Sequence, residues 1–115
     1  VEKYPLAKAF NETFQAKHGR NPEAYALYSY DAAKVVLAGL ESAIAANGGK
    51  KPSRKQVAEA VRAAKVDGLT GPIAFDSRGD RAQADYWVVR FDEAKYPGTA
   101  VTSVTAAPPG AEEKK

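Results

Sequence analysis

The stretch Asn21-Pro-Glu-Ala-Tyr-Ala-Leu-Tyr-Ser-Tyr-Asp-Ala-Ala-Lys34 joins a helix start to three closely spaced tyrosines. Asn21 suits an N-cap, Pro22 suits the first helical position, and an acidic residue follows in the first turn. Only Gly39 interrupts the helical pattern before Asn47, so we predict a helix near residues 22–46. Its apolar residues fall on two faces, and such a helix must be covered on more than one side.

A shorter helix is expected before this one. Pro5 suits a first turn, and the apolar residues Leu6, Phe10 and Phe14 recur every four positions. This spacing predicts an amphipathic helix near residues 5–18 with its aromatic face buried.

A third helix is expected after the long one. Ser53 and Gln56 have the spacing of a capping box, in which each residue satisfies a backbone N–H near the other. Apolar residues then follow on one side only, which predicts a short helix near residues 54–64.

The pattern changes in the segment Asp67-Gly-Leu-Thr-Gly-Pro-Ile-Ala-Phe-Asp-Ser-Arg-Gly-Asp80. Its glycines stop a helix, and its Ile and Phe have the spacing of a strand near residues 72–75. The residues from Asp76 to Asp80 are typical of a tight turn.

The rest of the chain predicts strands and a tail. Residues 84–92 are rich in Tyr, Trp, Val and Phe and form the strongest predicted strand. Residues 99–105 form a weaker one, after a turn at Pro97-Gly98. Residues 106–115 have nothing to bury and are expected to be disordered. The predicted fold class is therefore α/β, with three helices and two to three strands.

The composition argues against catalysis, metal binding and a membrane span. Hydrophobic content of 44%, charged content of 27% and a net charge of +3 are ordinary for a globular protein. There is no cysteine, and no apolar run approaches the ~20 residues of a membrane helix. His18 is the single histidine and lies at a polar helix end, so a zinc site would need mostly carboxylates. We therefore expect that the protein is not an enzyme and has no catalytic residue. We also expect that it binds no metal ion and no cofactor and has no membrane-spanning helix.

Two charged patterns have structural explanations. One basic cluster surrounds a Pro-Ser turn without interleaved aromatics, which indicates a solvated face and no nucleic-acid partner. Its members are Lys50, Lys51, Arg54 and Lys55. Asp76 and Asp80 bracket a turn but lack the alternating acids and distal Glu of a calcium loop. The tripeptide of integrin-binding loops, Arg78-Gly79-Asp80, is short enough to recur by chance.

The aromatic residues are the remaining candidates for a site. Tyr25, Tyr28 and Tyr30 fall in the first turns of the long helix, and a tyrosine offers an apolar ring with a polar end. Such rings suit a pocket for a small amphipathic ligand. They suit equally well a role as core or interface anchors.

Three segments together carry a family resemblance. Glu23–Ala32 resembles a "YDA" helix, Phe10–Gly19 resembles a helix that ends in Tyr/His-Gly, and Val66–Asp80 is similar to a "GxTGxxxFDxxGD" segment. In this order and spacing, over about residues 5–93, they resemble the C-terminal part of the periplasmic solute-binding proteins of branched-chain amino acid ABC transporters.

The resemblance implies a type I periplasmic-binding-protein fold, in which two Rossmann-like lobes joined by crossing segments close over a ligand. Residues 1–98 would be the C-terminal part of one such lobe. The resemblance implies that Tyr25 lines the ligand pocket, with Tyr28 one turn further on, and that Asp31 holds helix or hinge structure. The implied hinge or crossing residues are Asp85, Tyr86 and Trp87.

In function, the resemblance implies capture of an amino acid or similar small polar solute for an ABC permease, in the periplasm or at the cell surface. This chain would then be a fragment that lacks most of the site. Two alternatives are a stand-alone oligomerising interaction module without a small ligand, and the same fold used as a cytoplasmic amide sensor. The apolar flank of the long helix predicts that the isolated chain dimerises.

Overall fold

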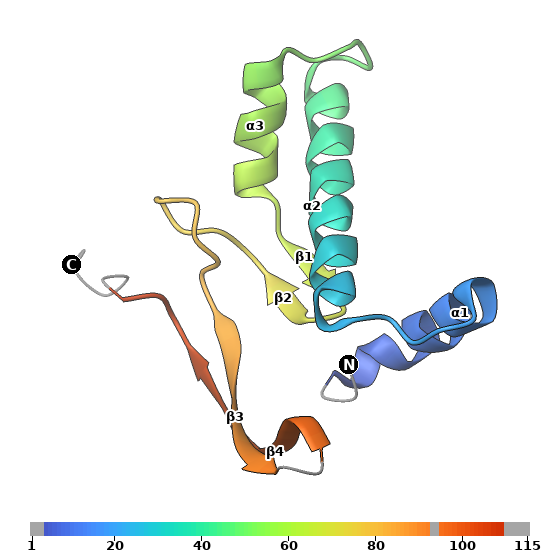
Figure 1. The fold of residues 1–115 in the computed structure, drawn as a ribbon. Coiled ribbons are helices and arrows are strands. Elements are labelled where there is room, and N and C mark those ends of the chain that lie inside the picture. The colour runs from blue at the N-terminus through green and yellow to red at the C-terminus, as the bar shows by residue number, and fades with distance from the viewer. Residues whose placement is uncertain (1–3, 93–94, 110–115) are drawn as a thin grey trace.

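The computed structural model describes residues 4–92 and 95–109, with three helices followed by four strands (Figure 1). The elements are the 3-10 turn η1 (Pro5–Ala7), α1 (Lys8–His18), α2 (Ala24–Ala46), α3 (Arg54–Ala63), β1 (Val66–Gly68), β2 (Gly71–Ile73), β3 (Ala84–Asp92) and β4 (Lys95–Ala106). The α/β class predicted from the sequence is confirmed.

Helices α2 and α3 lie side by side and form the body of the molecule (Figure 1). The buried residues of α2 recur every four positions on one stripe, and neither of the two faces expected from the sequence matches that stripe. They are Leu27, Asp31, Val35, Gly39 and Ala43. Gly39 allows the close approach of α3, since a Cβ there would lie 2.5 Å from Val61 Cγ2 and 2.8 Å from Val61 Cα.

The aromatic face of α1 is not buried, contrary to the prediction from its spacing. No residue of α1 is buried, and Leu6 in η1 is 64% exposed. The cover comes mainly from α2, where the Tyr30 ring centroid lies 5.3 Å from that of Phe10. One aromatic ring is too little to enclose a whole helix face, so Phe10 and Phe14 remain half-buried.

The caps of α2 and α3 differ in how well the sequence predicts them. Helix α2 starts two residues later than expected: Glu23 is its N-cap, in extended conformation, and Pro22 lies buried before the cap. That ring packs inside the fold and does not begin the helix. For α3 the capping box is confirmed, with Gln56 N–H donating to Ser53 Oγ and Ser53 N–H donating to Gln56 Oε1.

The short strands β1 and β2 form an antiparallel hairpin at the N-terminal end of α2 (Figure 1). The sequence did not predict β1, and β2 ends at Ile73 although a strand near 72–75 was expected. Phe75 forms only an isolated bridge with Arg81. Strands of three residues carry too little alternation to be recognised in a sequence.

Strands β3 and β4 form a two-stranded antiparallel ribbon that leads away from the helices (Figure 1). Asp92 pairs with Lys95, so the chain reverses before Pro97, and the predicted turn at Pro97-Gly98 lies inside β4 instead. The strand expected at 99–105 is part of this longer β4. The last six residues of the tail expected at 106–115 lie outside the described residues.

The molecule has far more surface than a compact domain of its size. Its accessible area is 8934 Å² for 12.3 kDa, against roughly 6,100 Å² for a compact monomer. Its radius of gyration is 17.2 Å, against roughly 13 Å for a compact chain of this length. Besides its tyrosines, α2 exposes the aliphatic residues Val36 and Leu37. The large hydrophobic residues that the ribbon exposes are Tyr86, Val88, Val89, Phe91, Val101 and Val104. Both α2 and the ribbon therefore present uncovered apolar surface.

None of the helices in the described part of the chain has the length and apolar character needed to cross a membrane.

Candidate functional site

The turn between β1 and β2 is held by a carboxylate from α2. Asp31 is 2% exposed, and its Oδ1 accepts the Leu69 N–H at 2.7 Å while its Oδ2 accepts the Thr70 N–H at 2.8 Å. Two-residue hairpin turns usually need a positive φ at the first central residue, yet every positive φ among the described residues belongs to a glycine. The positive φ of this hairpin belongs to Gly71, at 97° directly after Leu69 and Thr70, and Asp31 stabilises the N–H groups of these two residues.

Gly68 gives the carboxylate access to that turn. A Cβ at this position would lie 2.6 Å from Asp31 Oδ2 and 2.7 Å from Ile73 Cδ1. Any side chain would displace the acid from its hydrogen bonds. The glycine is thus required by the close approach of α2, and Asp31 holds the turn between β1 and β2.

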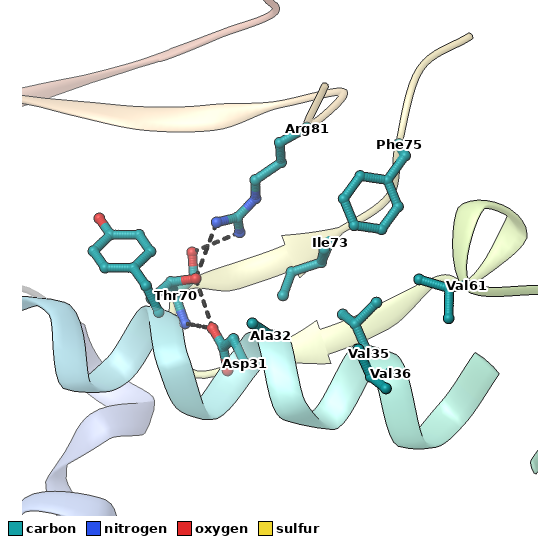
Figure 2. A pocket seen from close by; sticks show the side chains of 10 residues that line it. Asp31, Ala32, Val35, Val36, Val61, Thr70, Ile73, Phe75 and Arg81 are labelled. Carbon is teal, nitrogen blue, oxygen red and sulfur yellow. Dashed lines mark hydrogen bonds between the residues drawn. The ribbon is translucent and has the colours of Figure 1, made fainter. Parts of the chain in front are cut away.

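Thr70 connects the acid to a cation (Figure 2). Its hydroxyl is 2.6 Å from Asp31 Oδ2 and 3.0 Å from Arg81 Nη1, so it donates to the first and accepts from the second. Arg81 Nη2 also donates to the carbonyls of Thr70, Gly71 and Pro72, at 3.0, 3.4 and 3.1 Å. Arg81 Nε is buried and has no hydrogen-bond partner. Polar groups thus link α2, the hairpin and the segment before β3.

A cavity of about 270 Å³ lies beside this polar link (Figure 2). Its wall is apolar except at one end, where the polar lining residues lie: Tyr28, Asp31, Thr70 and Arg81. The apolar lining is Ala32, Val35, Val36, Val61, Ile73 and Phe75. The size and lining suit an apolar group with a polar end.

The turn before β3, at residues 76–80, is held together by its own charged side chains. Asp76 Oδ1 accepts the backbone N–H groups of Arg78 and Asp80, both at 2.9 Å. Burial acts to raise the pKa of Asp76, but these two hydrogen bonds and the Arg78 side chain outweigh it and lower the pKa below its ordinary value. Arg78 Nε also lies 3.5 Å from Asp80 Oδ2. The turn-forming role predicted for these acids is confirmed.

Four aromatic rings form a cluster at the start of α2. Tyr4 makes edge-to-face contacts with Tyr28 and Trp87, with ring centroids 6.3 and 6.1 Å apart. The Tyr4 and Tyr28 hydroxyls are 2.7 Å apart, and the Tyr25 ring lies 6.4 Å from that of Tyr28. Tyr25 and Tyr28 therefore contact each other directly, and Tyr4 joins Trp87 to them.

Exposure separates the members of this cluster. Tyr25 is 81% exposed and Tyr28 43%, while Trp87 is half-buried. The other two residues expected at the crossing lie on β3: Asp85 accepts a hydrogen bond from Thr105 Oγ1 at 2.6 Å, and Tyr86 is exposed. Because side chains alternate along a strand, Tyr86 faces away from Asp85 and Trp87.

Three residues of the site, Tyr4, Thr70 and Arg81, were not predicted from the sequence. Tyr4 precedes the first helix, and nothing in its local sequence indicates a partner on α2. The glycines on either side of Leu69-Thr70 were the available signal for a tight turn, but not for the acid that binds it.

Tyr28 is less acidic than an ordinary tyrosine. Burial, followed by the hydrogen bond with Tyr4, raises the pKa of Tyr28 from 10.0 to about 12. The hydroxyl therefore stays protonated at neutral pH and is able to donate a hydrogen bond.

The described residues contain no group of three His, Cys, Asp or Glu side chains that could hold a metal ion. The chemistry they offer is aromatic contact and hydrogen bonding, from Tyr25 and Tyr28 at the start of α2. This is the chemistry of a binding surface.

Comparison with known proteins finds one matching family model and two similar proteins. A model described as "Periplasmic binding protein" matches residues 2–96. The chain is 34% identical over 87 residues to the leucine-, isoleucine-, valine-, threonine- and alanine-binding protein of Pseudomonas aeruginosa. The aligned residues are 76% of this chain and 22% of that protein. It is 42% identical over 62 residues to metabotropic glutamate receptor-like protein E of Dictyostelium discoideum. This alignment includes 53% of this chain and 8% of that protein. The chain thus spans about a fifth or less of these relatives. No solved structure matches at the same level of significance.

The first prediction concerns Asp31. Asp31→Asn keeps the shape but places an NH₂ group against backbone N–H donors, so we expect a loss of about 3 kcal/mol in the free energy of unfolding. Urea denaturation measures the loss. Asp67→Asn, an exposed acid on β1, is the matched control and should be nearly neutral. Equal midpoints for the two variants would contradict the role given to Asp31.

The second prediction concerns Tyr28. In an alkaline titration followed by tyrosinate absorbance, we expect one step near pH 12 that Tyr28→Phe removes and Tyr4→Phe moves downward. Because the folded pKa is raised, the associated stability is fully present below pH 10.0 and is lost as the pH rises through about 12. Titration of all tyrosines together near pH 10.0 would show that the Tyr4–Tyr28 contact does not form.

Proposed function

Because the chain belongs to the periplasmic binding protein family, we propose that it is part of a two-lobed receptor that closes over an amino acid or a similar small polar solute. The observation that carries the proposal is the aromatic cluster at the start of α2, with Tyr25 81% exposed. A ring that contacts one neighbouring ring, that of Tyr28, and is otherwise mostly exposed is suited to packing on a ligand.

The proposed mechanism is capture by lobe closure. A ligand that touches both lobes only in the closed state favours that state by its difference in affinity for the two. Tyr25 would supply an apolar wall, and the protonated Tyr28 hydroxyl a hydrogen bond beside it. The ribbon of β3 and β4 would be the crossing between the lobes, with Asp85, Tyr86 and Trp87 near its start.

The excess of surface supports the proposal that this chain works as part of a longer protein. The exposed side of α2 and both sides of the ribbon carry apolar residues that a second lobe and the rest of the first lobe would cover. Most of the ligand contacts would then come from those parts.

We place the receptor outside the cytoplasm, in the periplasm or at the cell surface, as the solute-binding partner of an ABC permease. The named ligands of the P. aeruginosa relative are amino acids, which supports this ligand class. Discrimination between individual amino acids would depend on residues outside this chain.

A second candidate function is an oligomerising interaction module without a small ligand. It is favoured by the exposed Val36 and Leu37 on α2, which are 50% and 59% exposed. Apolar side chains exposed together on one helix flank are more typical of a contact surface than of a solvated face.

The third prediction tests the receptor by calorimetry. In a protein containing both lobes, Tyr25→Ala should weaken binding of leucine or valine about three- to tenfold, the effect of one aromatic contact. Tyr25→Phe keeps the ring and serves as the control, with affinity close to that of the parent. This chain alone should bind no tighter than about millimolar, because one wall does not supply the ~8 kcal/mol of a micromolar site. Micromolar binding by this chain alone, or an unaffected Tyr25→Ala, would contradict the site.

The fourth prediction concerns association. In size-exclusion chromatography with light scattering, this chain alone should dimerise, and Leu37→Lys should shift it to the monomer by placing a charge in the contact. Gln15→Lys, at an exposed position of α1, adds the same single charge and is the control. A dimer that persists in the longer protein, without any ligand, would favour the interaction module over the receptor.

A further inference from the structure

The turn between α2 and α3, together with the start of α3, carries a dense group of positive charges, which we call the basic tip. Its side chains are all exposed, and no acidic residue lies between Gly48 and Ala58. Together these charges exceed the net charge of +3 of the whole chain, so the rest of the chain carries a net negative charge. The members of the basic tip are Lys50, Lys51, Arg54 and Lys55.

Little of this charge is neutralised within the molecule. Lys55 Nζ lies 3.9 Å from Glu59 Oε1, and both side chains are largely exposed. An exposed ion pair at this distance is weak. None of the ion pairs within residues 4–92 and 95–109 includes Lys50, Lys51 or Arg54. The basic tip therefore presents nearly all of its charge to whatever approaches it.

The backbone below these side chains is fixed by hydrogen bonds. Asn47 Nδ2 donates to the carbonyls of Lys50 and Lys51, at 3.3 and 3.1 Å. Asn47 Oδ1 accepts from Gln56 Nε2 at 3.3 Å, and Gln56 also forms the capping box of α3 with Ser53. Because the turn and the start of α3 are tied together, the positive charges stay close to one another without a further ordering cost for the backbone.

The basic tip lies at the opposite end of α2 from the aromatic cluster (Figure 1). A helix of 23 residues is about 35 Å long, whereas charges in about 0.1 M salt act over about 10 Å. The tip is the outer end of the α2–α3 pair (Figure 1), and a protruding end of this kind reaches a broad surface more readily than it encloses a small anion.

We propose that the basic tip binds a membrane surface through anionic phospholipid headgroups. Clustered lysines and arginines are attracted to such headgroups by charge alone, and no interleaved aromatic residues are needed. Lysine supplies all but one of the charges, and its ammonium group attracts anions without a fixed geometry, whereas the arginine fork is better matched to the carboxylates of a protein partner.

The number of charges determines the strength of the expected binding. Each Lys or Arg near an anionic lipid surface raises the partition onto it about fivefold, so the basic tip as a whole raises it on the order of 500-fold. The inference goes beyond the proposed function and does not depend on it, because the basic tip and Tyr25 lie at opposite ends of α2.

Vesicle flotation of this chain tests the inference. Vesicles of equal parts phosphatidylcholine and phosphatidylglycerol are compared with vesicles of phosphatidylcholine alone, and the ratio of the two partition coefficients is measured. The exposed apolar residues of α2 and the ribbon meet both kinds of vesicle alike, so the ratio reports the effect of charge. We expect a ratio on the order of 500 in about 0.1 M salt and close to one in about 1 M salt, where charges act over only about 3 Å.

Charge-matched variants locate the binding on the surface. The tip variant carries Lys50→Gln, Lys51→Gln, Arg54→Gln and Lys55→Gln. The control carries Lys8→Gln, Lys17→Gln, Arg20→Gln and Arg90→Gln, at exposed positions of other elements. Both lose the same net charge, yet we expect the ratio to fall close to one in the tip variant and by less than about fivefold in the control. Replacing the lysines of the tip with arginine keeps the charge and should keep the ratio.

Circular dichroism verifies that each variant retains its helices. If the tip variant does not fold, Lys50→Gln with Lys51→Gln tests the same surface and should lower the ratio about 25-fold. A ratio near one for the parent chain would overturn the inference, as would an equal fall in the tip variant and the control.

Two competing probes separate the membrane from other anionic partners. Binding of the parent chain to poly-L-glutamate without a preference for the anionic vesicles would indicate an acidic protein surface and overturn the inference. Inhibition by inorganic phosphate beyond that of sodium chloride at equal ionic strength would indicate a site for a single anion and overturn it as well.

Discussion

The Asp31 carboxylate, buried in the first half of α2, is the interaction on which the rest of the structure depends. A buried acid is costly unless its oxygens are bonded, and here the backbone of Leu69 and Thr70 and the Thr70 hydroxyl supply the bonds. That requirement fixes the hairpin of β1 and β2 against α2. Thr70 then positions Arg81, and Arg81 determines where β3 begins.

The aromatic cluster is built on this frame. Asp31 lies one turn after Tyr28 on α2, so the same helix that holds the hairpin also presents the tyrosines. One helix face thus combines a rigid, fully bonded acid with exposed rings whose contacts are weak. The lobe closure proposed for the longer protein would need both a frame that keeps its geometry and a surface whose contacts exchange readily.

Sequence reasoning succeeded where the signal was local. The capping box of Ser53 and Gln56 and the turn acids around Asp76 depend on residues a few positions apart, and both are present as expected. It was wrong where the burial of a residue depends on packing against residues distant in the sequence. The burial of Phe10 and Phe14 depends on how much protein lies opposite α1, and the choice of the Leu27–Asp31–Val35 stripe on α2 depends on where α3 and the hairpin pack. At the site, the tyrosines of α2 stood out by composition, whereas Tyr4 and Arg81 acquire their partners only through the fold.

The hydrogen bonds of Asp31 also bear on how the chain folds. They join residues 38 and 39 positions apart, and closing a loop of that length costs about 3 kcal/mol of chain entropy. The α2–α3 pair and the β3–β4 ribbon each connect nearby segments and can form without that cost. Desolvation of the acid would then be a late event, after both local units exist. Changes at Asp31 would accelerate unfolding and hardly alter the rate of folding, so that this residue governs the kinetic lifetime of the native state.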